Sequence, residues 1–179
     1  MLLLGCKPQG RNTEQHDIFF GIGKSLKELV PQIEQCWPGA GKIHIDCWRE
    51  VTHVDGYKIS IRENSGVKTD PGKKLFFINL GGYKQNDFEE YHYKILQVAS
   101  NQSEAIYSAK QSAFYKHMSF TGAASHIDDK YGIDVDDIYE ITDILPAAVK
   151  QQFQITMEAV EQDRVDALHP GYTKLSSLL

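Results

Sequence analysis

Hydrophobic and polar positions follow the same order twice along the chain. The stretch 75–117 begins with the apolar run LFFINLGGY, continues through a polar turn to EEYHYKILQVAS, and ends in NQSEAIYSAKQSAFYKH. The stretch 1–37 has the matching order MLLLGC, polar turn, EQHDIFFGIG and SLKELVPQIEQCW. Short apolar or alternating runs are typical of strands, and apolar residues at helical spacing are typical of an amphipathic helix. Each stretch therefore predicts two strands followed by a helix.

Four residues of the first stretch recur 76 positions later: Leu4 as Leu80, Gly5 as Gly81, Glu14 as Glu90 and His16 as His92. Recurrence at a fixed period indicates an internal repeat. After its helix the first copy continues with the alternating KIHIDCWREV and GYKISIRE, which predict two more strands. We therefore predict an α+β protein of two similar ββαββ units, each an antiparallel sheet covered on one face by its helix, related by a pseudo-twofold axis.

The boundary between the copies is predicted at the polar stretch ENSGVKTDPGKK, which has the Gly and Pro content of a linker. This places the first copy at 1–66, the linker at 67–74 and the second copy at 75–179. The second copy has an inserted loop at 118–135 and a C-terminal tail. Two alignments of the later strands are open: one matches 44–46 with 126–128, and the other matches 42–51 with 136–145 and 57–61 with 153–157. We favour the second alignment, because it gives every strand an equivalent and leaves the insertion as a surface loop.

Composition narrows the class of protein. Hydrophobic residues make up 41% of the 179 residues, which is enough for a substantial core. The net charge is -5 and the 19 Lys and Arg residues form no basic stripe, so nucleic-acid binding is disfavoured. No apolar run is long enough to cross a membrane, and MLLLGC lacks the parts of a signal peptide. Three cysteines without paired spacing fit reduced thiols in a cytoplasmic protein.

Two pairs of polar residues in the first copy have the spacing that places side chains on one strand face. Glu14 and His16 form one pair, and His44 and Asp46 form the other. If their strands meet on one face, two imidazoles and two carboxylates converge. That set could carry acid and base steps near neutral pH, or bind a divalent metal through His16, His44 and Asp46. The alternative is an exposed polar sheet face.

Two further groups are weaker candidates for ligand binding. Arg11 and Asn12 lie in the first turn, where guanidinium and amide donors could bind a compact anion. The alternative is a solvated hairpin tip. Trp48 and the adjacent Arg49 could form an aromatic and cationic anchor of an interface.

Three segments resemble a bacterial family catalogued as a domain of unknown function, number 1543: GRNTEQHDIFFGIG, QCWPGAGKIHIDCWREVTHVDGYKI and SHIDDKYGIDVDDIYEITDILP. The resemblance implies one or two domain copies per chain. It implies no activity, cofactor or catalytic residue.

Two functions follow as hypotheses. The sequence contains no nucleophile elbow, phosphate-binding glycine loop, Cys-x-x-Cys pair or His-Glu-x-x-His helix. We therefore favour a non-catalytic module that binds a small molecule or a protein, in a chain that could form homo-oligomers. The alternative is a metal-dependent or acid/base enzyme that uses Glu14, His16, His44 and Asp46. The sequence identifies no cofactor.

Overall fold

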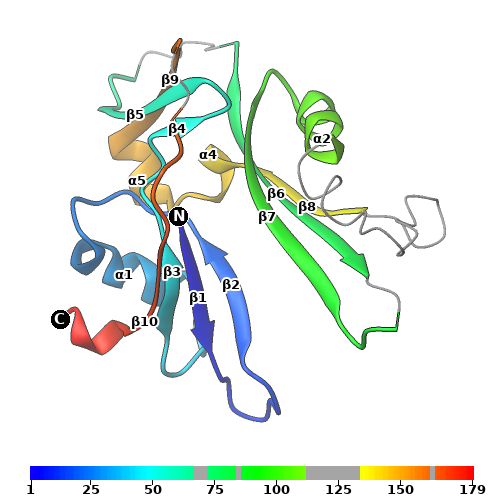
Figure 1. The fold of residues 1–179 in the computed structure, drawn as a ribbon. Helices are drawn as coiled ribbons and strands as arrows, with labels where there is room; N and C mark the ends of the chain where they lie inside the picture. Colours follow the sequence, from blue (N-terminus) through cyan, green and yellow to red (C-terminus); the bar gives the residue numbers. More distant parts are fainter. Residues whose placement is uncertain (67–71, 84–85, 112–133, 162–163) are drawn as a thin grey trace. The chain divides into compact units, whose positions relative to one another are not determined.

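The computed structural model combines antiparallel sheets with few helices, as expected for an α+β protein (Figure 1). The structure describes residues 1–66, 72–83, 86–111, 134–161 and 164–179. The chain forms two compact units. Unit 1 comprises Met1–Val67 and Ile144–Leu179, and unit 2 comprises Lys68–Asp143.

The main sheet of unit 1 has four antiparallel strands in the order β10, β3, β1, β2. The strands are β1 (Leu2–Cys6), β2 (Gln15–Phe19), β3 (His44–Trp48) and β10 (His169–Lys174). Helix α1 (Leu26–Cys36) follows β2, and the short 3-10 helix η1 (Leu175–Ser177) follows β10. This arrangement puts β1 and β3 at the centre of the sheet.

The core of unit 1 lies between one face of this sheet and α1. Leu4 of β1 and Ile45 of β3 pack there with Ile33 of α1, and all three are essentially inaccessible to solvent. Successive side chains of a strand point to opposite faces, so Gly5, His44 and Asp46 lie on the face turned away from this core. That second face carries the polar residues identified from the sequence.

A second, three-stranded sheet of unit 1 has the order β4, β5, β9. Its strands are β4 (His53–Val54), β5 (Tyr57–Glu63) and β9 (Phe153–Ala159). β9 pairs with β5 along its whole length, from Tyr57 with Ala159 to Glu63 with Phe153. Two short helices, α4 (Ile141–Ile144) and α5 (Ala147–Gln152), precede β9.

Unit 2 contains one antiparallel sheet in the order β7, β6, β8, and helix α2 packs on it. The elements are β6 (Lys74–Tyr83), β7 (Glu90–Ala99), β8 (Asp134–Glu140) and α2 (Gln102–Lys110). Phe76, Ile78 and Leu80 alternate along β6 and pack with Ala105 and Ala109 of α2. As in unit 1, the helix covers one face of the sheet, and the residues between these on β6 belong to the other face.

Both long helices begin with a side chain that caps the first turn. The Ser25 hydroxyl accepts a hydrogen bond from the backbone N–H of Glu28, and the Asn101 side chain accepts one from the N–H of Glu104. The two glutamates bond back to the N–H groups of Lys24 and Ser100. Each cap satisfies donors that the first helical turn leaves unpaired, which explains why the helices begin where they do.

The Glu104 cap predicts a pH effect on stability. A hydrogen bond from Lys73 at 2.9 Å, reinforced by the Ser100 N–H, lowers the pKa of Glu104 from 4.5 to about 2. A lowered folded-state pKa stabilises the fold above the unfolded-state pKa, and this contribution is lost as the pH falls through the folded-state value. We expect thermal unfolding measured from pH 5 to pH 2 to show a shallower loss of stability for Glu104→Gln than for the unsubstituted chain. Identical slopes would contradict this role of Glu104.

Several boundaries differ from those predicted. The segment 136–145, which the favoured alignment matches with a strand at 42–51, belongs to β8 only as far as Glu140, after which the chain forms α4. The strand predicted at 153–157 is present as β9, but it pairs with β5 of unit 1. The compact units therefore do not coincide with the predicted copies 1–66 and 75–179, because the chain after Asp143 returns to form strands with the first segment. Most of the predicted insertion 118–135, including 126–128, lies outside the described residues.

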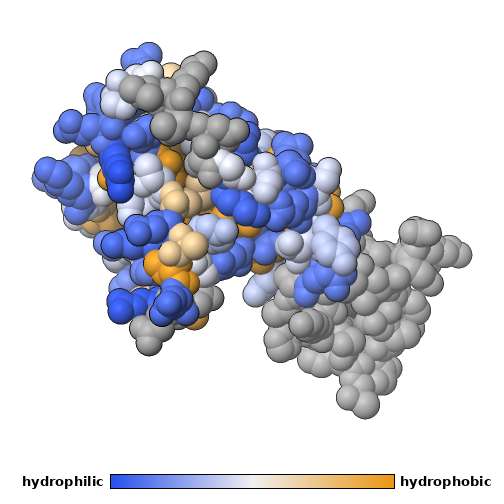
Figure 2. All heavy atoms as spheres, turned by 90° about the horizontal axis from the view of Figure 1, so that it is seen from above, coloured by the Kyte–Doolittle hydropathy of each residue, from blue (hydrophilic) through white to orange (hydrophobic). Residues whose placement is uncertain are grey.

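The part of the surface that the structure describes is mainly hydrophilic on the face shown. Hydrophilic side chains cover most of the coloured surface on the face shown in Figure 2, and hydrophobic ones occur there in small groups. Among the helices that the structure describes, none has the length and apolar character needed to cross a membrane.

Candidate metal centre

Strand β1 brings the two predicted pairs of polar residues together. Gly5 of β1 lies opposite His16 of β2 on one side and opposite His44 of β3 on the other. These three positions form one row across the sheet, on the face opposite α1. Glu14 immediately precedes β2, and Asp46 follows His44 by two residues. The sheet register therefore places all four candidate side chains in one place.

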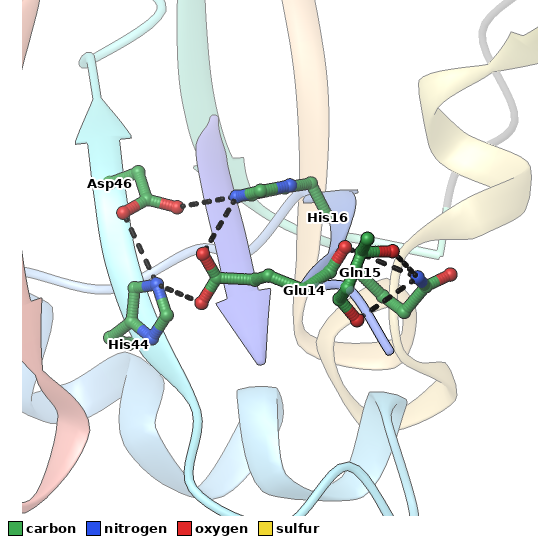
Figure 3. A network of polar contacts seen from close by, with 6 residues as sticks. Glu14, Gln15, His16, His44 and Asp46 are labelled. Carbon is green, nitrogen blue, oxygen red and sulfur yellow. Dashed lines mark hydrogen bonds and ion pairs between the residues drawn. The ribbon is translucent and has the colours of Figure 1, made fainter. Parts of the chain in front are cut away.

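Glu14, His16, His44 and Asp46, which we call the unit 1 cluster, form a closed ring of contacts (Figure 3). The Nε2 atom of His44 lies 3.1 Å from Glu14 Oε1 and 3.2 Å from Asp46 Oδ1. The Nε2 atom of His16 lies 3.3 Å from Asp46 Oδ2 and 3.7 Å from Glu14 Oε2. Each imidazole thus directs the same ring nitrogen at both carboxylates.

Gly5 leaves the space in which the ring forms. A Cβ atom at this position would lie 2.7 Å from Asp46 Oδ2 and closer still to His44 Nε2. Both separations are too short for non-bonded atoms, so any other residue would displace His44 or Asp46. Glycine in a strand interior often marks a place where other groups approach the backbone closely.

Asp46 reaches the cluster through an irregularity of the strand. The pairing of β1 with β3 passes from Leu3 with Cys47 to Leu4 with Ile45, so Asp46 has no partner in the ladder. A β-bulge of this kind redirects a side chain and is common beside functional sites. The Oδ2 atom of Asp46 is buried and accepts no hydrogen bond, although His16 Nε2 is nearby.

One side of the cluster is buried and the other is open to solvent. The side chain of His44 is only 6% exposed, whereas those of His16 and Glu14 are 45% and 44% exposed. The ring of His44 also contacts the ring of Tyr172 on β10, with their centroids 4.3 Å apart. β3 and β10 thus hold His44 in place, while the β2 side of the cluster faces water.

Cys6 follows Gly5 on β1 but is not part of the cluster. Its side chain is fully buried in the core of unit 1. Burial, together with the negative charge of Glu14, raises the pKa of the Cys6 thiol. The thiol therefore stays protonated, and the donors available at the cluster are nitrogen and oxygen atoms.

The contacts between imidazole nitrogen and carboxylate oxygen resemble the separations between adjacent ligands of a small divalent ion. Zinc binds imidazole nitrogen and carboxylate oxygen at roughly 2.0 to 2.2 Å in tetrahedral sites, which places neighbouring ligand atoms about 3.3 to 3.6 Å apart. The four contacts of the unit 1 cluster span 3.1 to 3.7 Å, and each imidazole contacts a different oxygen of each carboxylate. One ion at the centre would therefore require the four side chains to move closer together. Two carboxylates also supply the negative charge that a divalent cation requires.

The other predicted ligand-binding residues lie elsewhere. Arg11 and Asn12 are exposed in the turn between β1 and β2, and the backbone N–H of Arg11 bonds to the Pro8 carbonyl. Trp48 is half-buried against the core of unit 1 and stacks on His169 at a centroid distance of 4.0 Å. Packing within unit 1 thus accounts for the position of Trp48.

The guanidinium of Arg49 lies close to the sulfur of Met1, at 3.4 Å, and is half-buried. Gly5 and Tyr172 were not predicted from the sequence as parts of a site. Gly5 could have been found, because it recurs as Gly81 beside recurring Glu and His residues. No sequence signal connects Tyr172 with His44, since their contact depends on the pairing of distant strands.

Comparison with known proteins agrees with the family resemblance. Residues 11–61 match the model of a family described as a Domain of Unknown Function (DUF1543). All four residues of the unit 1 cluster lie within this DUF1543 match. The crystal structure of a protein Il1583 from Idiomarina loihiensis is similar to the chain, with 25% sequence identity and a TM-score of 0.59, over 97% of this chain and 94% of that one. No curated protein matches the sequence.

Proposed function

We propose that unit 1 binds a divalent transition-metal ion through Glu14, His16, His44 and Asp46. The observation that carries this proposal is the ring in which each of two imidazole nitrogens lies 3.1 to 3.7 Å from both carboxylates. An ion pair needs only one carboxylate for each imidazole. Ion pairing alone therefore does not require each imidazole to contact both carboxylates. An ion at the centre accounts for the convergence of all four side chains, and also for the buried Asp46 oxygen without a hydrogen bond.

The donor set favours zinc and ions of similar preference. Imidazole nitrogen suits zinc, copper, iron and nickel, whereas sites made only of carboxylate and carbonyl oxygens suit magnesium, calcium and manganese. Two imidazoles and two carboxylates therefore select for the first group. We expect zinc to bind more tightly than manganese.

The open side of the cluster supports a role beyond structure. Structural zinc sites are closed by four protein ligands, whereas catalytic sites keep a position for water or substrate. His16 and Glu14 are nearly half-exposed, so an outside oxygen ligand could reach an ion held there. Bound zinc lowers the pKa of its water, which is the basis of metal-assisted hydrolysis. We therefore favour metal-dependent binding or activation of a small oxygen ligand over a metal-free binding module.

The proposal includes an internal duplication. β1, β2, α1 and β3 follow one another in the same order as β6, β7, α2 and β8, and in each unit the first strand lies between the second and the third. Gly5 lies opposite His16, and Gly81 lies opposite His92, which agrees with the sequence offset of 76. When the two central glycines are superposed, His44 of β3 corresponds to Asp134 of β8. This register differs by four residues from the favoured sequence alignment, which matches 42–51 with 136–145.

Metal titration of protein purified without a metal-affinity tag tests the proposal. After removal of bound ions with a chelator, we expect zinc to bind to unit 1, and cobalt to give the strong visible absorption of a tetrahedral site. Asp46→Asn should weaken binding by more than about 100-fold, since the loss of groups that only orient ligands already costs about 10- to 100-fold. Competition with a chromophoric chelator would measure this change.

Asp17→Asn provides a matched control. Asp17 is the residue after His16 on β2, and its carboxylate accepts a hydrogen bond from the N–H of Ile18. By strand alternation it belongs to the other face of the sheet, so its replacement should leave the zinc affinity unchanged. Equal zinc affinity in Asp46→Asn and Asp17→Asn, with both proteins folded, would refute the proposal.

A further inference from the structure

We infer that unit 2 carries a second divalent-cation site, formed by Glu90, His92 and Asp136, which we call the unit 2 cluster. The Nε2 atom of His92 lies 3.2 Å from Asp136 Oδ2 and 3.9 Å from Glu90 Oε2. One ligand atom from each of the three residues can be chosen so that all lie within 4.8 Å of one another. This spacing lets all three bind one ion.

A glycine makes room for the unit 2 cluster, as it does in unit 1. Gly81 of β6 lies opposite His92 of β7 on one side and opposite Asp134 of β8 on the other. A Cβ atom at Gly81 would lie 2.8 Å from Asp136 Cγ and closer still to Asp136 Oδ2. The Asp136 carboxylate therefore occupies space that any other residue at position 81 would fill.

The backbone of unit 2 also repeats the irregularity of unit 1. The pairing of β6 with β8 passes from Asn79 with Asp137 to Leu80 with Val135, so the strand register shifts at Asp136. The register of β1 with β3 shifts in the same way at Asp46 in unit 1. Since a bulge disrupts the ladder, its occurrence beside the glycine in both units points to a role for the redirected aspartate.

The two clusters differ in their donors, which predicts different metal preferences. Unit 1 places His44 opposite its central glycine, whereas unit 2 places Asp134 at that register position. The unit 2 cluster therefore has one imidazole and two carboxylates, where unit 1 has two of each. Oxygen donors suit manganese and magnesium, so the preference for zinc over manganese should be smaller in unit 2 than in unit 1. The side chains of the unit 2 cluster are 32% to 39% exposed, which leaves positions for water.

Manganese can detect this site separately from the unit 1 site. Chelator-treated protein receives one equivalent of zinc, and manganese is then titrated while amide NMR signals are recorded. Paramagnetic manganese broadens the signals of nearby amides most strongly, so within unit 2 we expect the largest broadening at Gly81 and His92. Asp136→Asn should remove the broadening and weaken manganese binding by at least about 10-fold, and His92→Gln should do the same if Asp136→Asn fails to fold.

The two sites can fail independently, because they use different residues. Loss of zinc affinity in Asp46→Asn together with unchanged manganese broadening supports both sites. Broadening at Gly81 that persists in the folded Asp136→Asn and His92→Gln variants, or that never occurs, would overturn the second site and leave the first intact. Manganese binding at Gly81 in a protein that takes up no zinc at Gly5 would support the second site and refute the first.

Discussion

Gly5→Ala is expected to abolish metal binding at the unit 1 cluster. The added methyl group would lie within 3 Å of His44 Cε1 and Asp46 Oδ2, and nearer still to His44 Nε2. His44 is almost completely buried and lies against Tyr172, so it has little space in which to move away. We expect the zinc affinity to fall by more than about 100-fold, which is at least the loss expected for Asp46→Asn.

The backbone of Gly5 does not by itself require glycine. Glycine within a strand normally destabilises it by roughly 0.5 to 1 kcal/mol relative to alanine, because of its larger conformational entropy in the unfolded chain. Gly5→Ala should nevertheless destabilise the protein, since inserting a methyl group into a packed site typically costs about 1 to 3 kcal/mol. A loss of stability in Gly5→Ala would therefore indicate a crowded site, and a gain would indicate a strand position with free space.

Gly81→Ala is the matched control for Gly5→Ala. It adds the same methyl group at the corresponding strand position of unit 2, where the methyl would contact Asp136. We expect Gly5→Ala to lose the zinc site of unit 1 and keep manganese binding at unit 2. Gly81→Ala should keep the zinc site of unit 1 and lose manganese binding at unit 2. Isothermal titration calorimetry with each ion measures both affinities. A Gly5→Ala protein that is as stable as the original chain and binds zinc equally well would contradict this account of the site.

Local sequence patterns predicted the elements that build the unit 1 cluster. The apolar runs and the helical spacing predicted β1, β2 and α1, and the alternating stretch after the helix predicted β3. Two-residue spacing placed Glu14 with His16, and His44 with Asp46, on single strand faces. The sequence could not show that the two pairs come together, because this depends on β1 lying between β2 and β3 in the sheet.

Long-range pairing could not be predicted in the same way. The sequence of β9 has the alternation of a strand, but nothing within it specifies β5 as its neighbour. The bulges at Asp46 and Asp136 depend on how two distant strands align, so no local signal marked Asp136 as a candidate. Glu90 and His92 were visible as a repeat of Glu14 and His16. They form a candidate metal site only together with Asp136, and the register of β8 against β6 brings Asp136 beside them.

The core beneath the unit 1 cluster links stability to metal binding. Ile45 lies between His44 and Asp46 on β3, and its own side chain points into the core formed with Leu4 and Ile33. Packing on one face of the strand therefore fixes the two ligands on the other face. A cavity in the core would loosen β3 and the ligands together.

Ile45→Ala is expected to be strongly destabilising. Ile45 is fully buried, and truncation of such a side chain to alanine typically costs about 2 to 5 kcal/mol, a large part of the roughly 5 to 15 kcal/mol that stabilises an ordinary domain. Ile45→Val should cost only about 0.5 to 1.5 kcal/mol. Ile61→Ala, which truncates an isoleucine of β5 that is 44% exposed, serves as the control and should cost less than Ile45→Ala.

Urea unfolding of the three variants, with and without zinc, measures both effects. An ion that binds only the folded state stabilises it by about 2.7 kcal/mol when its free concentration is 100 times the Kd. We expect zinc to stabilise Ile61→Ala by the same amount as the original chain, and Ile45→Ala by less at equal zinc concentration, because its ligands are held less firmly. Equal zinc stabilisation of Ile45→Ala and Ile61→Ala would mean that the core does not position the ligands. Equal unfolding midpoints of these two variants without zinc would contradict the placement of Ile45 in the core.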